Sequence, residues 1–193
     1  MDRREFLKRA GVGSAALVSI PALAGTAQAT GALQRRYGAV AFSQGPLIGA
    51  VQHRIAVNAA GFFIPEAGVV LPNGGGTFVH FDNAPPVPKP IFAFGKWRPT
   101  SFVSYELGPP FGTWGTVQAS VLEMKVTLFA EFPVGAPPIG ATLKLICNIG
   151  PAGIMTGQPE GFVLTVPASP FGPLTFVPDV PAAGITTISV PGG

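Results

Sequence analysis

The sequence predicts an all-β protein, and three observations support this prediction. The chain of 193 residues contains 26 Gly and 22 Pro, which interrupt it too often for long helices. Short runs rich in Val, Ile, Phe and Thr lie between them, several at a spacing of about 8–12 residues. Hydrophobic residues make up 47% and charged residues 11%, a balance that favours a packed core over disorder. We expect an antiparallel β-sandwich of the immunoglobulin-like or jelly-roll type, with a β-barrel as the alternative.

Eleven segments have the composition of strands. They are 37–43, 50–58, 68–71, 77–82, 91–97, 101–107, 116–132, 141–149, 161–166, 174–177 and 185–190. Segments 69–71 and 77–81 flank a loop of Pro, Asn and three Gly, which predicts a hairpin between them. The tripeptide Pro-Phe-Gly occurs at 110–112 and at 170–172, and we interpret it as turn chemistry.

The clearest strand pattern lies in 116–132. Its apolar residues share one parity and its polar residues the other: Leu122, Met124, Val126 and Leu128 against Glu123, Lys125 and Thr127. This alternation predicts one face in the core and one face in water. Because the run is long for a single strand, we expect a bend or bulge near 129–131.

The segment 141–149 repeats the alternation, with Leu143, Leu145 and Cys147 on its apolar face. We expect it to form a hairpin with the preceding strand across 133–140. Cys147 is the only cysteine, so the chain has no intramolecular disulfide, and a buried hydrophobic role is the default for such a thiol. The proline-rich segment 84–90 is expected to be a connection or a covered edge within one domain, residues 30–193.

Residues 1–29 have the three-part layout of a cleavable signal peptide. A basic start leads into an apolar stretch, and small residues follow, ending in Ala27-Gln28-Ala29. We expect cleavage after Ala29, with Ala24 as the alternative site, or retention of the segment as an anchor. The stretch is too short and too rich in Gly, Ser and Pro for a good spanning helix.

The basic start closely resembles the twin-arginine export signal: two arginines, any residue, then Phe, Leu and often Lys. The matching positions are Arg3, Arg4, Phe6, Leu7 and Lys8. The resemblance implies export of an already folded protein by the bacterial twin-arginine pathway to the periplasm, cell wall or medium. It also implies the export machinery and a signal peptidase as partners. An ordinary secretory signal that contains Arg-Arg by chance is the alternative.

Charge makes nucleic acid an unsupported partner. Residues 1–29 contain four of the 12 basic and two of the nine acidic residues. Residues 30–193 therefore have eight basic and seven acidic residues, a net charge of +1. Such a chain has no basic stripe to neutralise phosphates.

The sequence offers no residue that we expect to be catalytic and implies no cofactor. His80 and Asp82 share one face of a predicted strand and His53 lies on another, so a two-histidine, one-carboxylate metal site is a minor hypothesis. The seven acidic residues after the signal offer no evident pair for glycoside hydrolysis: Glu66, Asp82, Glu106, Glu123, Glu131, Glu160 and Asp179. Trp97 and Trp114 are expected to cap the core.

We therefore expect a secreted or cell-envelope protein that acts without catalysis, as a binding or assembly module. Its apolar composition favours self-association or an envelope partner. The first alternative is a barrel that encloses a small apolar ligand behind Phe-rich walls. The second is a metal-dependent or carboxylate-based enzyme.

Overall fold

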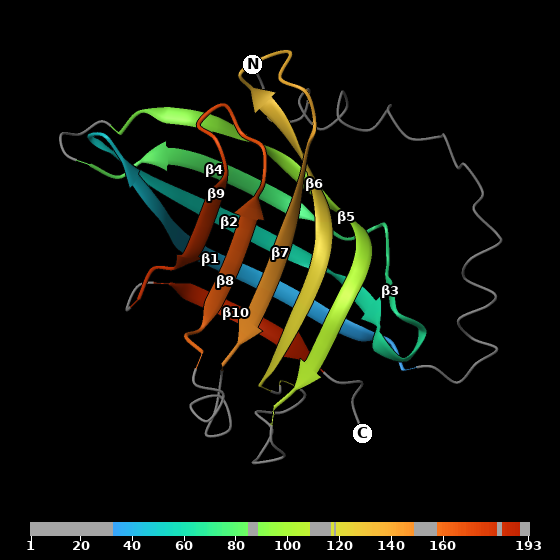
Figure 1. The fold of residues 1–193 in the computed structure, drawn as a ribbon. Helices are drawn as coiled ribbons and strands as arrows, with labels where there is room; N and C mark the ends of the chain where they lie inside the picture. The colour runs from blue at the N-terminus through green and yellow to red at the C-terminus, as the bar shows by residue number, and fades with distance from the viewer. Residues whose placement is uncertain are drawn as a thin grey trace, which may run out of the picture. The chain divides into compact units, whose positions relative to one another are not determined.

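The computed structural model describes residues 33–84, 89–108, 117, 119–148, 158–180 and 183–189. The predicted signal segment 1–29 and Trp114 lie outside these residues. The strands, shown in Figure 1, are β1 (Arg35–Ile48), β2 (Val51–Ile64), β3 (Val69–Val70), β4 (Gly76–Asp82), β5 (Ile91–Leu107), β6 (Ser120–Phe132), β7 (Ile139–Cys147), β8 (Gly161–Val166), β9 (Leu174–Pro178) and β10 (Gly184–Ser189). A single 3-10 turn, Pro65–Ala67, follows β2.

All ten strands belong to one antiparallel sheet, in the order β10-β1-β9-β8-β7-β6-β5-β4-β2-β3. β1 pairs with β2 along one edge, and along its other edge with β10 at residues 36–41 and with β9 at 43–44. The sheet therefore closes into a ring through β1. The all-β antiparallel class is confirmed. The described strands form no second sheet, so the ring corresponds to the barrel alternative and not to the two layers of a sandwich.

The antiparallel order sets which connections share an end of the ring. β1, β4, β6 and β8 all run in one direction, so the β1–β2, β4–β5, β6–β7 and β8–β9 connections lie at the same end (Figure 1). The expected β6–β7 hairpin is confirmed, with Leu128 opposite Ile139. Part of the proline-rich connection, residues 85–88, lies outside the described residues.

Bulges bend the longer strands, as closure of a sheet requires. The β5–β6 pairing steps from Phe94–Phe132 to Gly95–Ala130, which leaves Glu131 as an extra residue and confirms the bulge expected near 129–131. The two segments predicted at 91–97 and 101–107 are one strand, β5. Two further register shifts, after Pro99 and after Phe102, let it follow the curve.

The predicted hairpin between 69–71 and 77–81 is wrong. β3 pairs with the end of β2, with Phe63 opposite Val70, while β4 pairs with β2 and β5. The reason is the tight turn after β2. Gly68 adopts a left-handed conformation (φ 63°) and its N–H bonds to the Pro65 carbonyl, so the chain reverses before β3.

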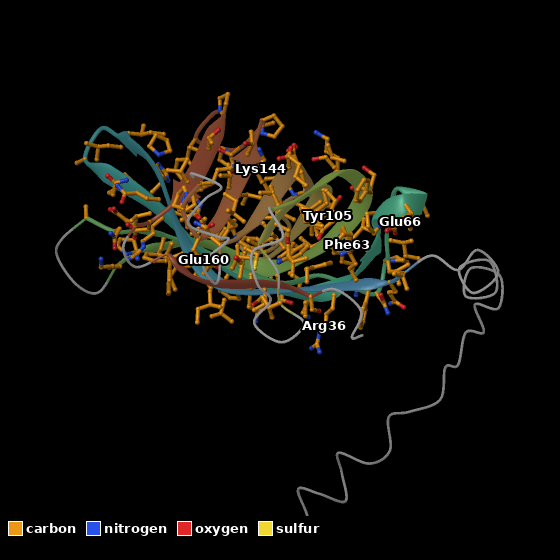
Figure 2. The ribbon with its side chains drawn as sticks, turned by 90° about the horizontal axis from the view of Figure 1, so that it is seen from below. Arg36, Phe63, Glu66, Tyr105, Lys144 and Glu160 are labelled. Atoms are coloured by element: carbon orange, nitrogen blue, oxygen red, sulfur yellow. The ribbon has the colours of Figure 1, made fainter. Side chains whose placement is uncertain are left out.

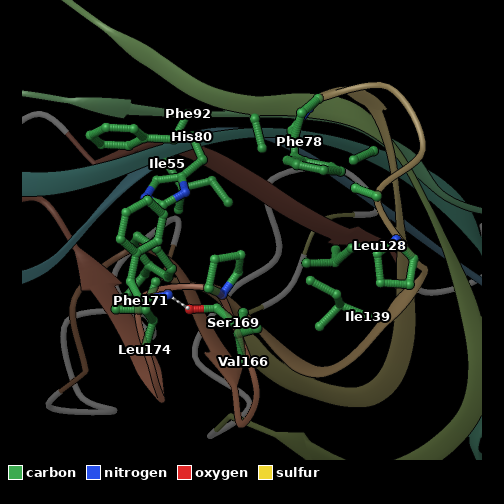
Figure 3. Close-up of a pocket in the computed structure, with 17 residues that line it drawn as sticks. Ile55, Phe78, His80, Phe92, Leu128, Ile139, Val166, Ser169, Phe171 and Leu174 are labelled. Atoms are coloured by element: carbon green, nitrogen blue, oxygen red, sulfur yellow. Dashed lines mark hydrogen bonds between the residues drawn. The ribbon is translucent and has the colours of Figure 1, made fainter.

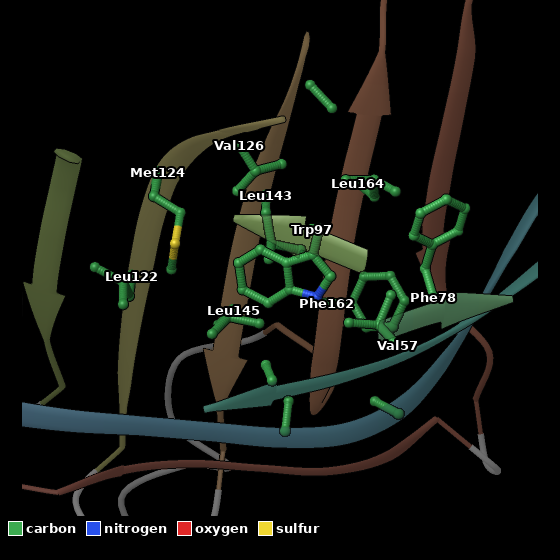
Figure 4. Close-up of a cluster of buried hydrophobic side chains, with 14 of the residues drawn as sticks. Val57, Phe78, Trp97, Leu122, Met124, Val126, Leu143, Leu145, Phe162 and Leu164 are labelled. Atoms are coloured by element: carbon green, nitrogen blue, oxygen red, sulfur yellow. The ribbon is translucent and has the colours of Figure 1, made fainter. Parts of the chain in front are cut away.

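The core fills the inside of the ring, where every second residue of each strand points (Figure 4). The predicted apolar faces of β6 and β7 are confirmed: Leu122, Met124, Leu143, Leu145 and Cys147 are at most 1% exposed. On the outer face of the same pair, the Lys144 ammonium lies 3.6 Å from the Glu123 carboxylate. Within the described residues, no helix is long and apolar enough to cross a membrane.

An aromatic and charged cluster lies at the end of the ring where β2 and β5 finish, and Figure 2 labels Phe63, Glu66 and Tyr105 of this cluster. The Tyr105 ring lies 5.0 Å from the Phe63 ring, and the Arg35 guanidinium sits 5.0 Å from the Tyr105 ring. Arg35 also lies 3.7 Å from the Glu66 carboxylate.

Candidate functional site

The topology brings His53 and His80 together although 27 residues separate them in the chain. β2 pairs with β4 so that His53 is opposite Asp82 and Ile55 is opposite His80. Both histidines have the parity of their strands' buried residues, so both side chains point into the ring as diagonal neighbours.

The two imidazoles form a direct buried hydrogen bond. His53 Nδ1 lies 2.8 Å from His80 Nε2, and the residues are 0% and 8% exposed. One ring must donate and the other accept, and the geometry allows either direction. In both cases His53 Nε2 is buried with no hydrogen-bond partner among the described residues. Nδ1 of His80 is the ring nitrogen that the pair leaves available.

Two irregularities in the sheet make room for this pair. In β1 the register shifts between Gln44 and Leu47, so that Gly45 and Pro46 both lie opposite His53. A Cβ on Gly45 would be 3.0 Å from the His53 Cβ and 2.8 Å from the Phe176 ring. In β5 the register shifts at Phe92, which becomes an extra residue beside His80. Such bulges re-aim side chains, and the β5 bulge places the Phe92 ring beside both histidines.

Phenylalanines enclose the histidine pair. Phe92 lies 5.2 Å from the His80 ring and 5.4 Å from the His53 ring, measured between centroids. Phe171, in the β8–β9 hairpin, lies 4.8 Å edge-on to His53 and 5.1 Å from Phe92. Phe176 of β9 lies 5.3 Å from His80. The pair is thus held in an apolar cage built from two strands, β5 and β9, and the β8–β9 hairpin.

This environment keeps both histidines neutral. Burial, together with the neighbouring His53, lowers the pKa of His80 to about 4. Burial also lowers the pKa of His53, and the Asp82 carboxylate opposes that shift. An imidazolium is unfavourable here because the cage supplies no hydration.

A pocket of about 260 Å³ opens beside His80, at the end of the ring where the hairpins meet (Figure 3). Four phenylalanines line it, together with aliphatic side chains and the prolines of two hairpins. The phenylalanines are Phe78, Phe92, Phe171 and Phe176. The β6–β7 hairpin contributes Pro133 and Pro137, and the β8–β9 hairpin contributes Pro170.

Among the described residues that line the pocket, two have polar side chains, His80 and Ser169. The Ser169 hydroxyl is occupied within its own hairpin: it donates to the Gly172 carbonyl at 2.6 Å and accepts from the Phe171 N–H at 3.1 Å. His80 is therefore the side chain that offers a polar atom to the pocket.

The metal hypothesis for His53, His80 and Asp82 is only partly met by the geometry. The histidines do meet, but as a hydrogen-bonded pair 2.8 Å apart, whereas two nitrogens on one tetrahedral zinc lie about 3.3 Å apart. The Asp82 carboxylate accepts from the backbone N–H groups of Gln52 and Ala84 at 3.0 and 2.9 Å. No group of three His, Cys, Asp or Glu side chains that could hold an ion occurs in the described part of the chain.

The other candidates lie away from the pocket. None of the seven carboxylates lines it. Glu131 and Asp179 pair with Lys96 and Arg54 at 2.8 and 2.5 Å. Glu160 accepts from the Thr186 backbone N–H and hydroxyl at 2.6 and 2.5 Å. Trp97 is in the core at 2% exposure, as expected.

Sequence reasoning missed Phe92 and Phe171 as site residues. Phe171 belongs to the Pro-Phe-Gly tripeptide that we interpreted as turn chemistry, and its contact with the histidines depends on the fold. Comparison of the chain with known protein families, curated proteins and solved structures found no match.

Proposed function

We propose that this protein binds a small, mainly apolar molecule in the pocket beside His80 and does so without catalysis. The observation that carries the proposal is the pocket itself, which is lined by phenylalanine, aliphatic and proline side chains with one available polar group. Ligand sites are commonly apolar cavities with few polar groups that orient the ligand, and they often lie in the mouths of β-barrels.

The pocket's size limits the ligand. Its volume of about 260 Å³ exceeds the ~150 Å³ of an engineered cavity that binds benzene. It lies just below the ~300 Å³ at which sites for drug-sized molecules begin. A bicyclic hydrocarbon or a comparable short-chain compound is the size that fits.

Binding fits the chemistry of the site better than catalysis does. A histidine whose pKa is about 4 is a weak base at neutral pH, far from the matching that general base catalysis favours. The thiol of Cys147 is buried in the core, and Cys147 does not line the pocket.

A direct test uses native mass spectrometry and calorimetry on the full chain with indane as a probe. We expect saturable binding of one indane per chain. Ala130→Phe fills the pocket and should abolish binding, because Ala130 lines it. The control is Ala60→Phe, at an exposed residue on the outer face of β2. This variant should bind indane as wild type does. Equal binding by wild type and Ala130→Phe would contradict the proposal.

Export remains a proposal that rests on residues 1–29. The twin-arginine pattern at Arg3 and Arg4 supports delivery of the folded protein to the periplasm, cell wall or medium. Export after folding suits a ligand-binding ring without disulfides, because its pocket exists only in the folded chain.

Assembly at the envelope is a second candidate, favoured by apolar side chains on the outer face. Val40 of β1 and Ile185 of β10 are paired neighbours and are 69% and 61% exposed. Light scattering of the full chain would test self-association. Val40→Lys with Ile185→Lys should convert any oligomer to monomer. If the wild-type protein is a monomer at high concentration, self-association is excluded.

A further inference from the structure

We infer that the ligand carries one uncharged oxygen group, a hydroxyl or a carbonyl, which hydrogen-bonds to Nδ1 of His80, and that the His53–His80 pair adapts to either. This inference rests on the proposed ligand site and specifies the chemistry of its ligand. Three features of the site support the inference. One ring nitrogen of His80 is available to a ligand, this nitrogen can accept or donate a hydrogen bond, and the pocket disfavours a charged ligand.

The available atom follows from elimination within the pocket. Of the two polar side chains that line it, Ser169 uses its hydroxyl within its own hairpin. His80 uses Nε2 for His53, which leaves Nδ1. A polar group on the ligand would therefore pair with this nitrogen, and a ligand oxygen elsewhere in the pocket would face apolar side chains at a cost.

The pair can present Nδ1 as an acceptor or as a donor. When His80 Nε2–H donates to His53 Nδ1, the Nδ1 of His80 is bare and accepts from a hydroxyl. When His53 Nδ1–H donates to His80 Nε2, the proton of His80 is on Nδ1 and donates to a carbonyl. Each ring keeps one proton in both states, and the change alters only the tautomers. His53 Nε2 is buried and has no hydrogen-bond partner in the described part of the chain, so no other contact there fixes the tautomer of His53.

The site does not suit a carboxylate. Both imidazoles are neutral at pH 7, because burial lowers the pKa of each. A carboxylate would enter an apolar cavity whose lining, as far as the structure describes the chain, includes no lysine or arginine side chain. Burying that charge costs far more than burying an alcohol or a ketone.

A matched ligand series tests the inference by calorimetry on the full chain: indane, 2-indanol, 2-indanone and indane-2-carboxylate. The variant is His53→Phe with His80→Phe, which removes both polar groups together and keeps aromatic rings in the cage. Because His80 lines the pocket, the affinity for indane should change as well; the affinities for the alcohol and the ketone should fall about tenfold further than the affinity for indane, because the ligand oxygen is left unpaired. Thr165→Val, on the outer face of the strand that carries Val166, is the control and should change none of these affinities.

The outcomes separate the two proposals. If indane and its derivatives all fail to bind to wild type, the ligand site itself is wrong. A second outcome is that wild type binds these ligands but the double variant loses no more affinity for the alcohol and the ketone than for indane. The ligand site then stands, and the role of His80 is overturned. Tighter binding of the carboxylate than of the alcohol would overturn the uncharged class.

Nitrogen NMR of the four imidazole nitrogens gives a second readout that does not depend on affinity. With 2-indanol we expect the protons on His80 Nε2 and His53 Nε2. With 2-indanone we expect them on His80 Nδ1 and His53 Nδ1. The same tautomer in both complexes would overturn the adaptable pair, even if both ligands bind.

Discussion

The indole N–H of Trp97 on β5 donates to the backbone carbonyl of Asn58 on β2 at 3.0 Å, although β4 lies between these strands in the sheet. Gly76 of β4 is the residue paired with Trp97. A Cβ at Gly76 would be 1.9 Å from the same Asn58 oxygen, so only glycine lets the indole reach across. This contact ties three strands of the ring together near the pocket wall that Phe78 forms.

Trp97→Phe should lower the free energy of unfolding by about 1–3 kcal/mol. The substitution removes the donor to a carbonyl and leaves a gap in the core, where Trp97 is 2% exposed. Urea unfolding followed by circular dichroism measures the change. Stability equal to that of wild type would show that the cross-strand contact contributes nothing.

Acidification should destabilise the fold through the histidine pair. The unfolded histidine binds a proton at about pH 6.5, whereas folded His80 resists protonation until about pH 4. Between these values the unfolded state holds more protons, so the free energy of unfolding falls as the pH falls, by on the order of 3 kcal/mol for His80. The contribution is complete above pH 6.5 and is lost on passing down through pH 4.

Urea unfolding at several pH values between 7 and 4 measures this slope. The control is His53→Phe with His80→Phe, which lacks both imidazoles and keeps every carboxylate. Its stability should vary less with pH than that of wild type. Identical slopes in the two proteins would contradict the assignment of the effect to the pair.

Gly45→Ala should destabilise the protein by about 1–3 kcal/mol and weaken ligand binding. The new Cβ would meet the Phe176 ring at 2.8 Å, and Phe176 lines the pocket and packs against His80. Gly140→Ala is the matched control, because a Cβ there has no atom within 4 Å. Thermal unfolding and indane binding of the two variants make the comparison. A Gly45 variant as stable as the Gly140 variant would show that the bulge tolerates a side chain.

Leu145→Ala should cost about 2–5 kcal/mol of unfolding free energy, because Leu145 is fully buried at the centre of the ring. Val134→Ala removes apolar volume at a residue that is 92% exposed, and it should change stability by less than about 0.5 kcal/mol. Chemical denaturation of both variants measures the difference. If both variants lost similar amounts of unfolding free energy, Leu145 would not be a core residue.

Replacing Arg3 and Arg4 by Lys should stop export while leaving the folded domain intact. Arg3 and Arg4 are the part of the proposed export signal that the twin-arginine resemblance requires, and Lys retains the charge that an ordinary secretory signal needs. Cell fractionation of a bacterial host that has the pathway locates the protein. Unchanged export of the Arg3→Lys, Arg4→Lys variant would favour the ordinary secretory signal.

The strands of this protein could be found from the sequence because each carries its own local signal. Alternating polarity along 122–128 places Leu122 inside and Glu123 outside whatever the partner strands are, and the structure agrees. The buried Cys147 and the bulge at Glu131 follow from the same local reasoning, from parity in one case and from strand length in the other.

Which strands pair is a property of the whole fold. A compact turn at 65–68 directs β3 onto β2, so the expected hairpin with β4 does not form, and β4 instead lies beside β2. That pairing alone sets His53 diagonal to His80, and the bulges opposite them are visible only in the register of both strands.

The sequence by itself therefore determined the all-β class, the approximate positions of most strands and the buried sides of β6 and β7, because these depend on neighbouring residues. The tertiary structure decided that the sheet closes through β1, that two distant histidines share a hydrogen bond and that phenylalanines from β5, β9 and the β8–β9 hairpin enclose them. These features depend on strand order and register, which arise from contacts between residues far apart in the chain.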